Sequence, residues 1–126
     1  MVKEIKYDDG TSKLLTYDTT PTKISKATSE EITRMLVAVT DSNKIKMEHY
    51  SVAMKTGTAQ VANKTGGGYY TDRHTHSFFG YFPAYDPEFI IFLYAVDPHG
   101  EEFASHTLTE PFFELTDFLI EYYAIA

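Results

Sequence analysis

Residues 50–60 read YSVAMKTGTAQ. Side chains suited to a strand recur at every second position of this stretch, and this period of two predicts a β-strand over residues 51–61. A Lys-Thr-Gly triplet, Lys55 to Gly57, lies inside the predicted strand. The side chains that share one face of it are Val52, Met54, Thr56 and Thr58.

The sequence on both sides of this strand predicts an α+β fold, an antiparallel sheet flanked by helices. An Asp-Gly turn predicts an N-terminal hairpin, and Gly66–Gly68 indicate a flexible loop over residues 62–73. The last strand is a continuous apolar run, typical of a strand buried on both faces. The predicted elements are a hairpin over residues 2–17, a helix over 29–39, strands over 51–61, 77–82 and 89–96, and a helix over 111–123.

Caps and apolar faces define the two helices. Thr28 and Glu31 are spaced as a capping box for the first helix, and Thr109 is the candidate N-cap of the second. The predicted core face of the first helix consists of Ile32, Met35, Leu36 and Val39. That of the second consists of Phe112, Leu115, Leu119 and Tyr122.

Length and composition indicate one globular domain. The chain has 126 residues, of which 43% are hydrophobic and 23% charged. The net charge of −7 argues against nucleic acid as a partner, because phosphates attract basic surfaces. No apolar run approaches the roughly 20 residues that span a bilayer, and the start lacks a signal-peptide core. With no cysteine, thiolate nucleophiles and cysteine-ligated zinc are excluded, and no cofactor is expected.

The Lys-Thr-Gly triplet has a chemical interpretation. A lysine on a sheet edge adds positive potential near a nucleophile and near a substrate carboxylate, and a hydroxyl beside it can bind that carboxylate. Glycine lets a substrate backbone approach the strand. The triplet is one of three motifs of serine-acylating, penicillin-recognising enzymes, together with Ser-x-x-Lys and Ser-x-Asn.

Over nearly its whole length the chain resembles class B penicillin-binding proteins, the D,D-transpeptidases that cross-link bacterial peptidoglycan. The resemblance rests on TSEEITRMLVAV from Thr28, on residues 50–60, on HSFFGYFPAYDPEF from His76, on Val96-Asp97-Pro98 and on the closing TEPFF helix. Met54 departs from the glycine that commonly precedes the motif lysine. The resemblance implies that residues 1–126 form the C-terminal portion of a penicillin-binding/β-lactamase-like transpeptidase domain.

The resemblance also implies roles for the motif residues. Lys55 would be the catalytic motif lysine, and Thr56 and Thr58 would present hydroxyls to the substrate carboxylate. The Thr58 backbone N–H would form half of the oxyanion hole. Gly57 would keep the strand open to the donor peptide, which adds to it as a strand. The implied partners of the complete domain are the peptidoglycan stem peptide and β-lactams.

The other two motifs are absent. No serine has lysine three positions later or asparagine two positions later. Without a nucleophile no acyl-enzyme forms, so we expect the chain alone to be inactive and to need the N-terminal half of the domain. The complete protein is expected at the extracytoplasmic face of the bacterial cytoplasmic membrane, held by a signal or anchor that this chain lacks. Two alternatives stay open: a non-catalytic module that binds stem peptide or a protein, and a serine β-lactamase fragment, which the Thr-Ala-Gln continuation disfavours.

Several histidine and aromatic residues have competing interpretations. His74 and His76 would share a strand face, but without a clear third ligand no metal site is predicted. Tyr69 and Tyr70 either flank the substrate groove or anchor the glycine loop. Phe79, Tyr81 and the apolar run over 89–96 are interpreted as sheet core. That run lacks a second neighbour unless the hairpin over 2–17 supplies it, and an open apolar edge predicts a poorly soluble or oligomeric chain.

Overall fold

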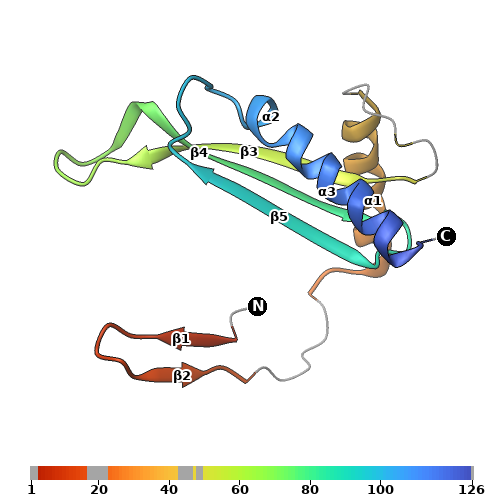
Figure 1. Cartoon of the computed structure of the whole chain (residues 1–126), viewed down its shortest axis with the longest axis horizontal. Helices are drawn as coiled ribbons and strands as arrows, with labels where there is room; N and C mark the ends of the chain where they lie inside the picture. The colour runs from red at the N-terminus through yellow and green to blue at the C-terminus, as the bar shows by residue number, and fades with distance from the viewer. Residues whose placement is uncertain (1–2, 17–22, 43–46, 48–49, 126) are drawn as a thin grey trace.

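The computed structural model describes residues 3–16, 23–42, 47 and 50–125. Within these residues, β1 and β2 form one antiparallel sheet, and a second has the strand order β3-β4-β5 (Figure 1). The predicted α+β class is therefore confirmed. None of the helices in this part of the chain is long and apolar enough to cross a membrane. The elements are β1 (Glu4–Lys6), β2 (Ser12–Leu14), α1 (Lys26–Ser42), β3 (Ala53–Ala62), β4 (Tyr69–Phe82), β5 (Phe89–Val96), α2 (Ala104–Thr107) and α3 (Thr109–Tyr123).

Strand β4 begins at Tyr69 and is therefore longer than the predicted strand over residues 77–82. Its partner Ala62 lies opposite Tyr69, so β3 and β4 form a long hairpin. Asn63 closes the turn, since its Oδ1 accepts hydrogen bonds from the N–H groups of Thr65 and Gly66 at 3.0 and 3.1 Å. The predicted flexible loop is wrong over residues 69–73, because these residues belong to β4, whose register with β3 shifts between Gln60 and Ala62.

Helix α1 extends beyond both ends of the predicted helix over 29–39. Ser25 caps it, because its Oγ accepts a hydrogen bond from the Thr28 N–H at 3.1 Å. Thr28 lies inside the helix, and Glu31 pairs with Arg34. The predicted capping box is therefore wrong.

Threonines define the face of α1 that packs on the sheet. The Thr40 hydroxyl donates to the Val52 carbonyl oxygen at 2.6 Å, and the Thr33 hydroxyl lies 2.7 Å from the Tyr81 hydroxyl. Both threonines are buried. The predicted apolar face is rotated partly away from the sheet, since Thr33 and Thr40 lie on the side of the helix that contacts it. Its exposed members are Ile32 and Met35.

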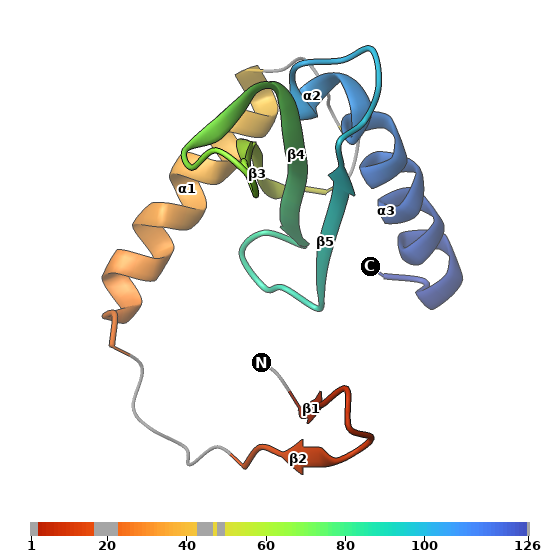
Figure 2. The ribbon, with the colours of Figure 1, turned by 90° about the vertical axis from the view of Figure 1, so that its left-hand side faces the viewer.

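Helices α2 and α3 lie on the face of the sheet opposite to α1 (Figure 2). Phe112 of α3 is fully buried and stacks on Phe78 of β4, with ring centroids 4.3 Å apart. Gly80 of β4 makes room for this ring. Phe78 and Phe112 belong to the core cluster, whose other fully or nearly buried members are Val52, Met54, Phe82, Ile91, Leu108, Phe113 and Ile125.

The start and the buried face of α3 both differ from the prediction. Thr109 is the first residue of the helix, and its hydroxyl donates to the Ser105 carbonyl oxygen at 2.7 Å, so it does not act as the N-cap. Phe112 is buried as predicted, with Phe113 and Thr116 beside it. The predicted members Leu115 and Tyr122 are exposed.

Strand β5 is covered on one face only. Ile91 is 6% exposed beneath α3, while the alternate side chains are between 60% and 71% exposed. The predictions of burial on both faces and of a core role for the whole run are therefore wrong within this chain. Helix α1 lies over β3 and leaves β5 open on that side (Figure 2). We call this open surface the uncovered β5 face; it consists of Ile90, Phe92, Tyr94 and Val96.

The hairpin of β1 and β2 turns at the predicted Asp9-Gly10 pair. Gly10 has a φ of 83°, and Asp9 Oδ1 accepts a hydrogen bond from the Thr11 N–H at 2.9 Å. Both strands are exposed, and both views place them apart from the other sheet (Figures 1 and 2). The hairpin therefore does not pair with the free edge of β5. The ends of the predicted hairpin, Val2 and Tyr17, lie outside the described residues.

Candidate functional site

The Lys-Thr-Gly triplet lies in β3, at an edge of the sheet. The strand pairs with β4 on one side, and no described strand pairs with its other side. In such a strand, alternate backbone N–H and C=O groups point to the open edge. Thr56 and Thr58 are two residues apart, so their backbone groups lie at the same edge.

The side chains of the motif are divided between the two faces of the sheet. Lys55 lies opposite Phe79 of β4, on the face that α1 partly covers, whereas Thr58 lies opposite His76, on the face of α2 and α3. Thr56 shares the face of Thr58. The exposed Lys55 ammonium donates a hydrogen bond to the carbonyl oxygen of Thr56 at 2.5 Å. The structure therefore brings these residues together at the strand edge rather than on one face.

Gly57 has a packing role that the sequence does not reveal. A Cβ at this position would lie 2.7 Å from the Ser77 Oγ of β4. The same hydroxyl donates to the Gly57 carbonyl oxygen at 3.3 Å. The glycine is thus needed for contact with β4, whatever its role towards a substrate.

The Thr58 hydroxyl is held by the start of α2. The Ala104 N–H donates a hydrogen bond to Thr58 Oγ1 at 3.1 Å. Ala104 is buried while Thr58 stays exposed, so a bound peptide can reach the hydroxyl from the strand edge. Neither Ala104 nor Ser77 was identifiable from the motif, because only the packing of α2 and the strand register bring them to β3.

The two histidines of β4 lie on one face, with ring centroids 6.4 Å apart. His76 is fully buried, and both of its ring nitrogens face protein oxygens. In the part of the chain that the structure describes, no group of three histidine, aspartate or glutamate side chains is arranged to hold a metal ion.

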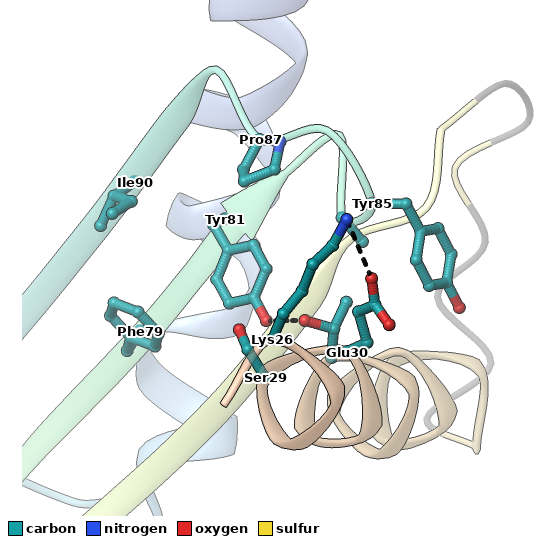
Figure 3. A pocket seen from close by; sticks show the side chains of 10 residues that line it. Lys26, Ser29, Glu30, Phe79, Tyr81, Tyr85, Pro87 and Ile90 are labelled. Carbon is teal, nitrogen blue, oxygen red and sulfur yellow. Dashed lines mark hydrogen bonds and ion pairs between the residues drawn. The ribbon is translucent and has the colours of Figure 1, made fainter. Parts of the chain in front are cut away.

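A cavity of about 430 Å³ lies between α1 and the sheet, and none of the motif residues lines it (Figure 3). The hydrogen-bonded Thr33 and Tyr81 form one wall, and the ion pair of Lys26 and Glu30 lies at the rim. The sequence predicted Tyr81 as sheet core, whereas its side chain lines this cavity. The cavity was not predictable, because it depends on how α1 packs against the sheet.

A second, polar cavity of about 380 Å³ lies between the first half of β4 and the segment that follows β5. Here Arg73 binds Asp97, with Nε 2.6 Å from Oδ2. This hydrogen bond and the guanidinium charge hold the pKa of the Asp97 carboxyl below its usual range. The Arg73 guanidinium also lies over the Tyr70 ring, 5.0 Å from its centroid, so Tyr70 supports this end of the hairpin while Tyr69 is exposed.

An antiparallel sheet between helices, with Lys-Thr-Gly on its edge strand, is consistent with the fold of penicillin-recognising proteins. The chain belongs to the penicillin-binding protein transpeptidase domain family, whose model matches residues 1–115. No curated protein matches its sequence.

Solved structures share this fold. Penicillin-binding protein 3 of Mycobacterium tuberculosis, solved with ampicillin, has a TM-score of 0.74 and 22% identity, over 98% of this chain and 30% of its own. A peptidoglycan synthetase of Bifidobacterium adolescentis has a TM-score of 0.62 and 22% identity, over 98% of this chain and 23% of its own. Penicillin-binding protein 2X of Streptococcus thermophilus has a TM-score of 0.59 and 24% identity, over 75% of this chain and 16% of its own. The chain therefore spans less than a third of the length of each of these proteins.

Proposed function

We propose that this chain supplies the motif-lysine strand of a serine-type peptidoglycan D,D-transpeptidase. The observation that carries the proposal is the open edge of β3, along which Lys55 to Thr58 follow one another. An unpaired strand edge binds an extended peptide through backbone hydrogen bonds. A stem peptide ending in D-Ala-D-Ala supplies both an extended backbone and a terminal carboxylate.

The charges at this edge suit a carboxylate. Lys55 is exposed and forms no ion pair with a carboxylate of the described residues. Its ammonium can therefore bind the terminal carboxylate of the peptide, together with the hydroxyls of Thr56 and Thr58. The Thr58 N–H supplies one donor of the oxyanion hole.

The proposed reaction has two steps, and both need a serine from another part of the domain. The serine hydroxyl attacks the carbonyl carbon of the penultimate D-alanine, its proton passes to a base, and the terminal D-alanine leaves as a protonated amine. An amine of a neighbouring stem then attacks the acyl-serine ester and releases the serine. A β-lactam acylates the same serine as its amide ring opens, in keeping with the ampicillin complex of the mycobacterial protein.

The uncovered β5 face is the surface to which we expect the rest of the domain to bind. Its four apolar side chains and the free edge of β5 form a surface that the described residues leave open. We place the nucleophile-bearing half of the domain against it, and the complete protein at the extracytoplasmic face of the membrane. Burying such side chains stabilises a complex by about 25 cal/mol for each Å² of apolar surface removed from water.

Fluorescent penicillin and a stem-like peptide test the proposal. We expect no covalent label on this chain alone, because it has neither Ser-x-x-Lys nor Ser-x-Asn. Stable labelling would show that the chain carries its own nucleophile. N-acetyl-L-lysyl-D-alanyl-D-alanine should shift the backbone amide NMR signals of residues 55–59.

Lysine variants locate the charge that the peptide needs. Lys55→Gln should weaken binding of the peptide, whereas Lys64→Gln, an exposed lysine in the turn after β3, should not. Equal effects of both variants, or shifts confined to another surface, would contradict a site at the edge of β3. Binding that persists while no complementary half restores penicillin labelling would favour the non-catalytic module.

A further inference from the structure

His76 is a buried polar side chain that the proposed reaction does not use. It is fully buried on β4, directly opposite Thr58 in the strand register. Cross-strand neighbours on one face lie within side-chain contact distance. The imidazole therefore lies beside Thr58, whose hydroxyl binds the substrate carboxylate in the proposed function.

Both ring nitrogens of His76 bind the segment over residues 102–107. Nε2 lies 2.9 Å from the carbonyl oxygen of Glu102, and Nδ1 lies 2.9 Å from Oγ1 of Thr107. A carbonyl oxygen only accepts hydrogen bonds, so Nε2 carries a hydrogen and donates it. The ring thus holds both ends of a short segment that contains α2.

The same segment binds Thr58. The Ala104 N–H donates to Thr58 Oγ1 at 3.1 Å, and the Ala104 carbonyl oxygen lies 3.3 Å from the Thr107 hydroxyl. These contacts close a loop of hydrogen bonds from His76 through residues 102–107 to Thr58. Within the described residues no buried side-chain nitrogen or oxygen lacks a hydrogen-bond partner.

This arrangement decides how the Thr58 hydroxyl can act. A hydroxyl has one hydrogen to donate and two lone pairs that accept. The Ala104 N–H occupies one lone pair, and the hydroxyl keeps its hydrogen, which it can donate to a ligand at the exposed side of Thr58. A carboxylate only accepts hydrogen bonds and is the matching partner.

We propose that His76 is a positioning residue, which holds residues 102–107 so that Thr58 presents its hydroxyl as a donor to the substrate carboxylate. The proposal rests on the function proposed above for the edge of β3. His76 itself touches no substrate. Its contribution is to the orientation of Thr58 and to the selection of ligands that end in a free carboxylate.

The first experiment needs no ligand and uses this chain. In His76→Leu, amide hydrogen exchange of Ala104 should accelerate at least tenfold relative to the core amide of Ile91. The Thr58 side chain should also populate more than one rotamer, as measured by three-bond scalar couplings in NMR. Phe78→Leu disturbs the adjacent core without touching the loop and should leave the Ala104-to-Ile91 ratio unchanged. His76→Gln should restore much of the protection, because its amide N–H can still donate to Glu102.

The second experiment compares N-acetyl-L-lysyl-D-alanyl-D-alanine with its C-terminal amide. His76→Leu should weaken binding of the acid about tenfold, as expected for loss of one charge-assisted hydrogen bond, and leave binding of the amide unchanged. Thr58→Val should have the same effect, and the double variant should show no further loss.

The outcomes separate the two proposals. Unchanged Ala104 exchange in His76→Leu overturns the positioning role, whatever the peptides do. If exchange changes but His76→Leu weakens binding of the acid and the amide equally, His76 has only a structural role. That result also overturns the proposal that it positions Thr58. Failure of the unmodified chain to bind either peptide overturns the proposed function, while the exchange experiment still decides whether His76 positions Thr58.

Discussion

Gly80→Ala tests the closest contact between the sheet and α3. A Cβ at position 80 would lie 2.4 Å from Cζ and 3.0 Å from Cε2 of Phe112, and 3.0 Å from the Ala53 carbonyl oxygen. Gly80 has no positive φ, so alanine suffers no backbone strain there. Any loss of stability therefore comes from the overlap with the ring and, to a smaller extent, with the Ala53 carbonyl oxygen.

The expected magnitude follows from that overlap. Non-bonded carbon atoms prefer about 3.5–4.0 Å, so the ring must retreat by roughly 1 Å. Phe112 is fully buried against Phe78 and cannot move into solvent. Overpacking of this kind costs about 1–3 kcal/mol, or a fall in Tm of about 4–12 °C for a domain of this size.

A double-mutant cycle measures how much of the cost comes from the Phe112 ring. Phe112→Leu removes the end of the ring, so Gly80→Ala should cost less than about 1 kcal/mol in that background, a coupling of about 1 kcal/mol or more. Phe113→Leu is the matched control: it is also buried in the core but is not among the nearest atoms to position 80, and its effect should add to that of Gly80→Ala.

Urea unfolding followed by far-UV circular dichroism measures all of these variants. It is performed at several protein concentrations, so that association does not enter the free energy of unfolding. A neutral or stabilising Gly80→Ala, or an equal cost in the Phe112→Leu background, would refute the packing argument.

Three further predictions concern the ion pair, the cap and the open strand. Because Arg73 lowers the pKa of Asp97 in the folded chain, their pairing stabilises the fold above about pH 4 and is lost as the pH falls through the folded-state value. Asp97→Asn should therefore make the loss of stability in acid shallower, and an unchanged pH profile in urea unfolding would contradict this. Ser25→Ala should cost about 0.5–2 kcal/mol in the same assay, and more than Thr28→Ala; the reverse order would restore the predicted capping box. The isolated chain should self-associate on size-exclusion chromatography, and Phe92→Thr should reduce this, whereas a stable monomer before mutation would contradict an aggregating β5 edge.

The class of fold and the motif strand were predictable from the sequence because their signals are local. Alternation places Thr56 and Thr58 on one face of a strand whatever packs against it. The apolar run of β5 likewise marks a strand, because its length and composition are intrinsic to eight consecutive residues. The same local rules predicted the Asp9-Gly10 turn.

The errors have a common physical origin. The apolar run of β5 predicted burial on both faces, yet a strand is buried only where another element covers it, and this chain covers one face. The apolar stripe of α1 predicted its buried face, yet the buried residues are Thr33 and Thr40, which hydrogen-bond with Tyr81 and Val52. Both outcomes depend on partners distant in the sequence.

By itself, then, the sequence predicted an α+β fold and a strand that carries Lys-Thr-Gly, because periodicity and turn signals depend on neighbouring residues; the transpeptidase family entered as a resemblance, which the family model confirms. Only the tertiary structure decided that this strand lies at an edge, that Lys55 and Thr58 lie on opposite faces, and that His76 and Thr58 both bind the segment over residues 102–107. Strand register and the docking of α2 are long-range pairings. Their energies depend on atoms that approach one another only when the chain is folded.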